Sequence, residues 1–238
     1  MIKRKPRIPM RDLTTLTGEE AEIARKNRLD GRDLNIFRVL MNNPQLARRW
    51  TVFAGHVLHK QTLPAREREL LILRIGWLNQ AEYEWAQHVE IAKRSAISTE
   101  EIERIKRGPG AGWSALEDAL LRAVDELYEN SVVSDQTWAT LAASLSVQQL
   151  MDLVFTVGQY NLVSWALNSF GVPLDDFLDT AKEGSAPFLR GGTRAIALGG
   201  FIRHAAVRVR QAARAILVGL LHGFFALRIA TVALGLLR

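Results

Sequence analysis

A helical repeat of apolar residues extends from Leu34 to about Thr180, and only short turn signals interrupt it. No alternating strand pattern lies between hairpin turns, and there is no glycine-rich phosphate-binding loop. The sequence therefore predicts an all-α fold. We expect helices near 17–27, 34–41, 44–60, 65–78, 80–95, 98–106, 113–130, 134–144, 146–170 and 173–181.

The segment 65–78 is apolar around most of its circumference. Such a helix is expected to be buried between neighbouring helices or across a subunit contact. Glu69 and Arg74 lie on the same segment and need partners if they are buried. Two later helix starts are marked by a capping residue with an acid three positions on, namely Asn79 with Glu82 and Ser98 with Glu101.

The net charge of +6 is concentrated at one end of the chain. Residues 1–185 carry 23 Lys and Arg against 25 Asp and Glu, whereas residues 186–238 carry eight Arg and no Lys or acidic residue. We therefore expect four parts. They are an N-terminal arm (1–34), a helical domain (35–183), a linker (184–192) and an Arg-rich apolar tail (193–238).

The tail 193–238 combines a basic amphipathic stretch with an apolar one, 215–237, that is long enough to cross a bilayer. His222 and Arg228 interrupt the apolar stretch, so membrane-surface contact, a span and a protein contact all stay open. Nucleic acid is not an expected partner, because the tail lacks interleaved base-reading residues. The N-terminus is basic without the apolar run of a signal peptide, which predicts a cytoplasmic protein, with membrane association through the tail as an option.

The chain contains no cysteine. This excludes disulfides, thiolate metal sites and cysteine nucleophiles together. Thiol redox chemistry is therefore not how the protein works. The hydrophobic content of 48% can fill a proper core, which argues against wholesale disorder.

Glu84 and His88 lie four residues apart, so on a helix they project from one face. A carboxylate beside an imidazole can serve as a general acid/base pair, because the carboxylate fixes the tautomer and favours the charged ring. Tyr83, Trp85 and Trp77 are expected to supply bulky walls that bind a substrate. On spacing alone, a Glu and a His four residues apart more often form an exposed or satisfied structural ion pair than a catalytic pair.

The segment LPARERELLILRIGWLNQAEYEWAQHVEIAK, residues 63–93, resembles the core of the carboxymuconolactone decarboxylase and alkylhydroperoxidase D superfamily. In the peroxidase branch, a glutamate precedes a Cys-x-x-Cys pair and a histidine four residues past the second cysteine. Here the glutamate falls at Glu69 and the histidine at His88, while Ala81 and Glu84 replace the two cysteines. The resemblance thus implies that peroxidase activity by the family's thiol mechanism is absent.

The decarboxylase branch is more similar, since its members carry a His-Glu or Tyr-Glu pair before the same histidine. The resemblance covers about 35–180 and returns at VGQYNLVSWALNSFGVPLD, residues 157–175. It implies a helical bundle of the alkylhydroperoxidase D type that forms homo-oligomers, either trimers or hexamers.

A decarboxylase-type lyase or isomerase acting on a small carboxylated lactone or enol acid is the function this resemblance implies. His88 would carry the proton. Glu84 would orient the His88 ring or act as the acid itself, and Glu69 would support His88 as a second carboxylate. Arg74 would anchor the substrate carboxylate, and no cofactor or metal is needed. The alternative is a non-catalytic oligomeric binding or scaffold protein that the tail tethers to a membrane.

The sequence leaves more than one role open for several other residues. His56 and His59 are three apart and could join a metal site, but ordinary surface histidines explain them as well. Glu69 could pair with Arg66 one turn back, and Arg74 could form an inter-helix ion pair. The segment 146–170 holds further polar and aromatic residues that are expected to pack in the core or at a subunit contact, namely Tyr160, Asn161, Trp165 and Asn168. The alternative is that Tyr160 or Asn168 lines the pocket.

Overall fold

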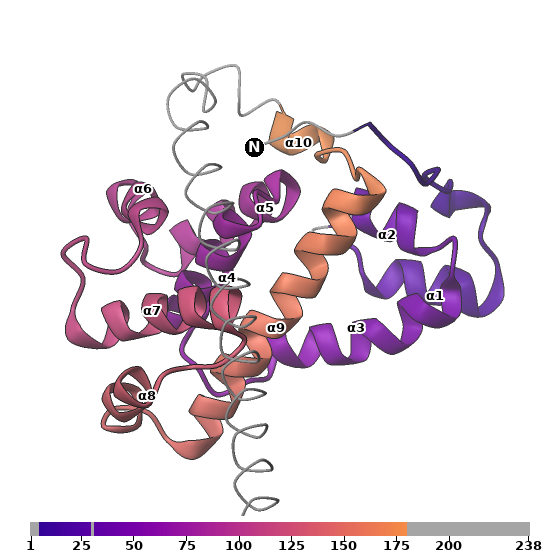
Figure 1. The fold of residues 1–238 in the computed structure, drawn as a ribbon. Helices are drawn as coiled ribbons and strands as arrows, with labels where there is room; N and C mark the ends of the chain where they lie inside the picture. The colour runs from indigo at the N-terminus through magenta and orange to yellow at the C-terminus, as the bar shows by residue number, and fades with distance from the viewer. Residues whose placement is uncertain (1–4, 30, 180–238) are drawn as a thin grey trace, which may run out of the picture. The chain divides into compact units, whose positions relative to one another are not determined.

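A computed structural model of the chain describes residues 5–29 and 31–179, and that part of the chain is helical, with one isolated bridge between Leu29 and Arg32 (Figure 1). The predicted all-α fold is confirmed. The elements are η1 (Leu13–Thr15), α1 (Gly18–Lys26), α2 (Asn35–Leu40), α3 (Pro44–His59), α4 (Ala65–Leu78), α5 (Glu82–Arg94), α6 (Thr99–Arg107), α7 (Ala115–Asn130), α8 (Asp135–Ala142), α9 (Val147–Phe170) and α10 (Asp176–Asp179).

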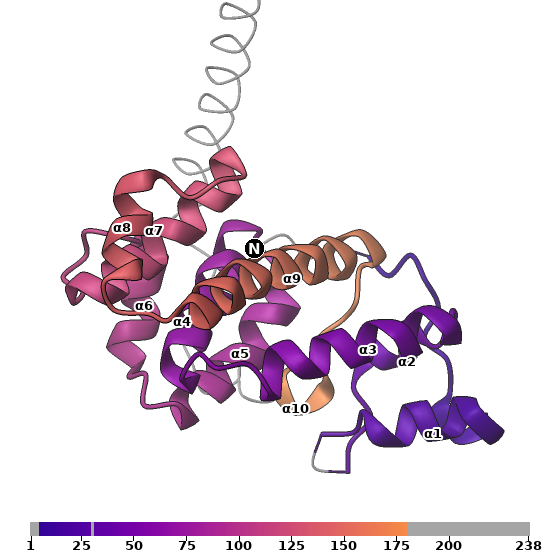
Figure 2. The same cartoon turned by 90° about the horizontal axis from the view of Figure 1, so that it is seen from below.

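Helices α1–α3 and α6–α8 lie at opposite ends of the described part, and α9 runs between them (Figures 1 and 2). The linker 184–192 and the tail 193–238 lie outside the described residues. Among residues 5–29 and 31–179, no helix combines the length and apolar character needed to cross a membrane.

Helix α4 is the centre of the packing, with α5, α6, α7 and α9 around it. Every residue from Glu69 to Gly76 is buried. One side of α4 packs through Leu71, Ile72 and Ile75 against α7 and α9. Its other side packs against α5 and α6. The expected burial of this helix is confirmed, and its own chain covers it without a partner subunit.

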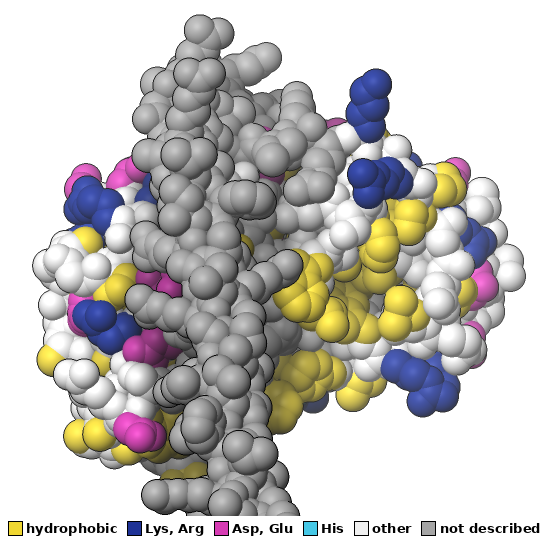
Figure 3. All heavy atoms as spheres, in the orientation of Figure 1, with side chains coloured by type: hydrophobic (Ala, Val, Ile, Leu, Met, Phe, Trp, Pro, Cys, Tyr) yellow, Lys and Arg dark blue, Asp and Glu magenta, His cyan; other side chains and the backbone are white. Residues whose placement is uncertain are grey.

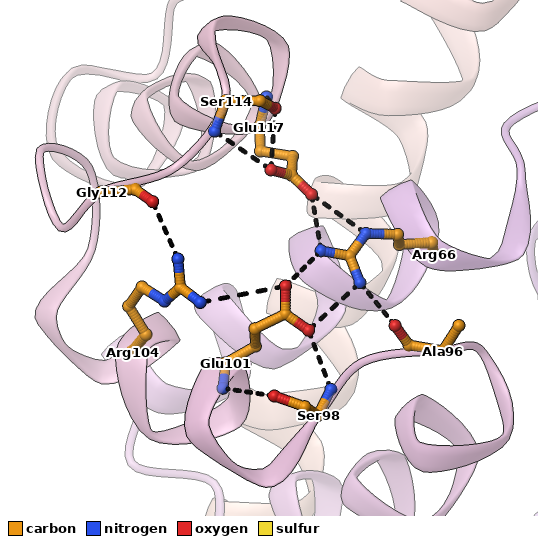
Figure 4. Close-up of polar contacts among 8 residues, drawn as sticks. All are labelled: Arg66, Ala96, Ser98, Glu101, Arg104, Gly112, Ser114 and Glu117. Atoms are coloured by element: carbon orange, nitrogen blue, oxygen red, sulfur yellow. Dashed lines mark hydrogen bonds and ion pairs between the residues drawn. The ribbon is translucent and has the colours of Figure 1, made fainter.

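Capping boxes fix the starts of α6, α7 and α9. The box predicted from Ser98 and Glu101 is present at α6, and Ser114 with Glu117 forms another at α7. Arg66 of α4 donates to both of these glutamates and to the carbonyl of Ala96 (Figure 4). One guanidinium group thus ties the beginnings of two helices to the central one. The alternative that Arg66 pairs with Glu69 is wrong, because Arg66 is committed to this contact.

The predicted N-cap at Asn79 is also wrong. Asn79 instead ends α4, Gln80 turns the chain with a φ of 53°, and Ala81 precedes α5 without a side-chain cap. The Asn79 side chain donates to Asn161 of α9, and its carbonyl accepts from Asn168 of the same helix. The turn before α5 is therefore held against α9.

Candidate functional site

His88 stands between two carboxylates at the contact of α4 with α5. Its Nδ1 lies 2.6 Å from Oε2 of Glu69, which belongs to α4. Its Nε2 lies 3.0 Å from Oε1 of Glu84, one turn earlier on α5. Glu69 is fully buried, and Glu84 and His88 are each only 5% exposed. The structure therefore brings together the three residues that the sequence suggested for acid/base chemistry.

Two further side chains complete this cluster. Arg68 donates through Nε to Oε1 of Glu69 at 3.0 Å, so both oxygens of that carboxylate are engaged. Tyr160 of α9 meets the His88 ring edge to face, with centroids 4.9 Å apart. Of the two roles that the sequence leaves open for Tyr160, packing or lining the pocket, the structure supports the second, because the Tyr160 ring lies against the His88 ring. Arg68 was missed, although a basic residue next to an expected buried acid was a usable signal.

The charges around His88 hold it in the protonated form. Burial by itself would lower the pKa of His88, but Glu69, and then Glu84, outweigh burial and raise that pKa to about 10. Burial would likewise raise the pKa of Glu69, yet His88 and Arg68 lower it. At neutral pH the cluster thus contains an imidazolium between two carboxylates.

This arrangement can store and pass on a proton. Glu69 positions the ring through Nδ1, so Nε2 points its proton at Glu84. Transfer of that proton to Glu84 would convert an ion pair into two neutral groups. No cluster of three or more His, Asp or Glu in the described part of the chain is arranged to hold a metal ion.

Tyr83 does not line this cluster, which corrects its assignment as a wall. Its hydroxyl donates to Oδ2 of Asp175 at 2.7 Å, and its ring packs with Val163 and Leu167 of α9. Successive helical residues point about 100° apart, so neighbours of Glu84 face other parts of the molecule. Asp175 is itself buried and accepts from the Asn35 backbone N–H, and no sequence motif marks it.

Trp77 and Trp85 also lie elsewhere, so they are not walls of the histidine site. Their rings contact each other at 5.4 Å between centroids, and Lys106 of α6 lies over both. Trp85 is buried in the cluster between α4, α5 and α6. These tryptophans build the core on the α6 side.

Arg74 forms a structural ion pair with Asp125, which corrects its assignment as a substrate anchor. Its Nε and Nη2 donate to the two oxygens of Asp125 at 2.7 and 2.8 Å. Its Nη1 donates to the carbonyls of Ile105 and Lys106 at 3.0 Å each. The guanidinium group is thus committed to α6 and α7, and the inter-helix alternative describes it correctly.

The remaining candidates fall outside the cluster. His56 is exposed and lies 4.0 Å from Asp152 of α9, and His59 is exposed at the end of α3. Asn161 and Asn168 hold the turn at Asn79, as described above. Trp165 is 58% exposed, so it packs in no core of the described residues.

A family comparison covers the segment that holds the cluster. Residues 44–126, from the start of α3 into α7, match the carboxymuconolactone decarboxylase family. This match supports the resemblance to the carboxymuconolactone decarboxylase and alkylhydroperoxidase D-like superfamily that the sequence indicates. Glu69, Glu84 and His88 all fall inside the matched segment. No curated protein sequence matched the chain.

Solved structures show the same fold. A peroxidase-related protein with an alkylhydroperoxidase AhpD core, from Ralstonia eutropha JMP134, is 18% identical with a TM-score of 0.64, over 73% of this chain and 94% of the other. A peroxidase-related protein from Silicibacter sp. TM1040 is 14% identical with a TM-score of 0.62, over 74% and 96%.

An enzyme is among these similar structures. The debrominase Bmp8, solved as a variant with 2,3,4-tribromopyrrole, is 12% identical with a TM-score of 0.55, over 68% of this chain and 88% of the other. At such low identities the likeness concerns the fold alone. The fold of this chain is thus one that an enzyme also uses.

Proposed function

We propose that this chain is an acid/base enzyme, a decarboxylase-type lyase or an isomerase, acting on a small carboxylated lactone or enol acid. Glu84 and His88 are the acid/base pair, and Glu69 is the positioning residue for His88. The observation that carries the proposal is the buried row of Glu69, His88 and Glu84, in which both ring nitrogens of one histidine face carboxylates. Buried, paired groups with a shifted pKa are typical of catalytic sites.

The direction of the His88 shift favours proton donation. A carboxylated lactone that loses CO2 keeps the electron pair of the broken C–C bond as a dienolate, which must then take up a proton at carbon. A dienolate is a strong base, so an imidazolium with a pKa of about 10 can supply that proton through Glu84. Water then returns a proton to His88. This chemistry calls for no cofactor.

An isomerase would use the same groups in the reverse order. Glu84 would first take a proton from the substrate carbon, and His88 would help to return it at another carbon. Because His88 holds its proton at neutral pH, Glu84 is the base in this version. The thiol peroxidase mechanism is not part of the proposal, since the sequence has no cysteine.

The test uses the full chain and four proteins: wild type, His88→Asn, Glu84→Gln and the control His59→Asn. CO2 release and loss of ultraviolet absorbance are followed over a panel of carboxylated lactones and enol acids. We expect turnover by wild type and the exposed-histidine control, and at least a hundredfold loss in the two site variants. Circular dichroism of each variant checks that the loss is not a loss of fold.

Two results count against the proposal. Turnover that survives in both folded site variants would remove Glu84 and His88 from the chemistry. No turnover by wild type anywhere on the panel would favour the alternative, a binding or scaffold protein that the tail 193–238 tethers to a membrane.

A further inference from the structure

The arginines of helix α4 differ in how their guanidinium groups are used. All three side-chain nitrogens of Arg66 donate to oxygens of the chain (Figure 4), and so do all three of Arg74. Arg68 donates through Nε to Glu69, but neither of its Nη nitrogens has a hydrogen-bond partner among the described residues. Arg68 thus keeps the outer edge of its guanidinium group unused.

The unused edge of Arg68 is not an ordinary surface feature. Figure 3 shows Lys and Arg side chains at separate places on the visible surface, where water satisfies their donors. The Arg68 side chain is only 14% exposed, against 28% for the fully engaged Arg66. Donors without a partner at such a buried position lower stability unless a water or a ligand binds them. The Nη nitrogens of Arg68 are therefore suited to an acceptor from outside the chain.

Arg68 stands at one end of the row of charged side chains in the acid/base site. Its Nε lies 3.0 Å from one oxygen of Glu69, and the other oxygen of Glu69 contacts His88. Glu84 closes the row at the far nitrogen of the His88 ring. Burial raises the pKa of Tyr160 well above its ordinary value, as do the two carboxylates, whereas the charge of Arg68 lowers it. The guanidinium group is thus close enough to act on the aromatic wall of the site.

A carboxylate is the acceptor that an open guanidinium edge fits best. The N–H groups of Nη1 and Nη2 lie parallel and match the two oxygens of a carboxylate. A molecule lying along the row would place its carboxylate at Arg68 and its reacting carbon at Glu84. Small lactone acids and enol acids have this form, because they carry a carboxylate and a reactive carbon a few bonds apart.

We propose that Arg68 anchors the substrate carboxylate through its Nη nitrogens, the role that the sequence alone suggested for Arg74. The inference rests on the proposed function, because it names a binding group of the same site. The anchored carboxylate is one that the reaction leaves on the molecule, since an ion pair with a departing carboxylate would stabilise the reactant more than the transition state. Arg68 therefore selects acids over their neutral esters.

The test compares an acid with its ester. Full-length wild type, Arg68→Gln, Arg68→Lys and the control Arg122→Gln are titrated by calorimetry with γ-butyrolactone-γ-carboxylate and with its methyl ester. This saturated lactone acid cannot form the dienolate, so it reports binding without turnover. The control removes an exposed arginine that pairs with Asp118 on α7.

The preference for the acid is the expected signature of the anchor. Wild type and the control should bind the acid about tenfold more tightly than the ester. This ratio should fall to about one in Arg68→Gln. Arg68→Lys keeps a charge beside Glu69 but offers no fork to a carboxylate, so it should lose most of the preference. Circular dichroism checks the fold, and Arg68→Lys alone decides if Arg68→Gln does not fold.

A residue that acted only through Glu69 would weaken the binding of acid and ester by the same factor, and that result overturns the proposal. A wild type that binds neither compound, or both equally, also overturns it.

Turnover measured on the lactone and enol-acid panel separates this inference from the proposed function. An acid preference that depends on Arg68, without turnover of any compound, overturns the proposed reaction and leaves the anchor in place. Turnover together with an unchanged binding ratio in the Arg68 variants overturns the anchor alone.

Discussion

The Nδ1 atom of His88 lies 2.6 Å from Oε2 of Glu69, a carboxylate that is fully buried on the central helix α4. The contact joins two helices and sets the orientation of the ring. A carboxylate at this nitrogen also directs the proton of the opposite nitrogen, Nε2, towards Glu84. The protonation state of His88 is therefore a direct measure of how the site works.

Wild-type His88 should remain protonated well above neutral pH. Glu69 contributes more to its raised pKa than Glu84, so Glu69→Gln should lower the pKa of His88 further than Glu84→Gln does. NMR titration of the His88 ring measures all three proteins. Glu90→Gln serves as the control because Glu90 pairs with Lys93 on the outside of α5. A wild-type midpoint near 6.5, or equal effects of the two site variants, contradicts this account.

Stability should fall as the pH rises from about 7 towards 10. The pKa of His88 is about 10 in the folded chain against an ordinary value of 6.5. The stabilisation is therefore fully present below pH 6.5 and is lost as the pH approaches 10, with a slope of at most about 1.4 kcal/mol per pH unit from this group. Urea unfolding at a series of pH values measures the slope. His88→Gln should flatten the curve, and an unchanged slope in that variant would assign it to other groups.

Gly108→Ala should destabilise the chain through Arg74. A Cβ at Gly108 would lie 2.6 Å from Nη2 of Arg74, and the residue has a φ of +82°. We expect a loss above about 3 kcal/mol, since backbone strain alone costs on the order of 1–3 kcal/mol. Gly110→Ala is the control, because Gly110 also has a positive φ but open space around it.

Thermal or urea unfolding compares the two glycine variants. The same change made in an Arg74→Met background should cost less, because the clash is then removed. If Gly108→Ala costs as much with Met at position 74 as with Arg, the contact with Arg74 is not the cause.

Arg66→Ala should cost about 1–2 kcal/mol, because it removes charge-assisted hydrogen bonds to the capping glutamates Glu101 and Glu117. Arg122→Ala should cost less than about 0.5 kcal/mol, since Arg122 forms an exposed i,i+4 pair with Asp118. Urea unfolding of both variants provides the measurement. Hydrogen exchange at the starts of α6 and α7 should quicken in Arg66→Ala alone, and equal losses in the two variants would show that the bridge adds nothing.

Local patterns predicted the helices well because helix formation is largely local. The segment 65–78 was expected from its apolar periodicity, and α4 has the same bounds, Ala65–Leu78. The box at Ser98 and Glu101 was also confirmed. The prediction for Asn79 is wrong because asparagine can also end a helix, and the spacing to the next acid does not distinguish an end from a start.

The site was only partly predictable, because local patterns indicate contacts within one helix but not contacts between distant segments. Glu84 and His88 are joined by helical spacing, and the resemblance to a known superfamily added Glu69. The contact of Tyr160 with His88 joins residues far apart in the sequence, which no local pattern reports. Tyr83 was placed in the wrong environment because its partner Asp175 lies 92 residues away.

The buried cluster described above has an evolutionary consequence. Arg68 and His88 bring two positive charges, Glu69 and Glu84 bring two negative ones, and the four cancel. Neutralising any one of the four side chains leaves an uncompensated charge in a buried, poorly hydrated environment, and this destabilises the folded chain. Lineages descended from such a chain can therefore change these positions cheaply only two at a time, an acid together with a base. Aligned relatives should record this as covariation between the opposite charges.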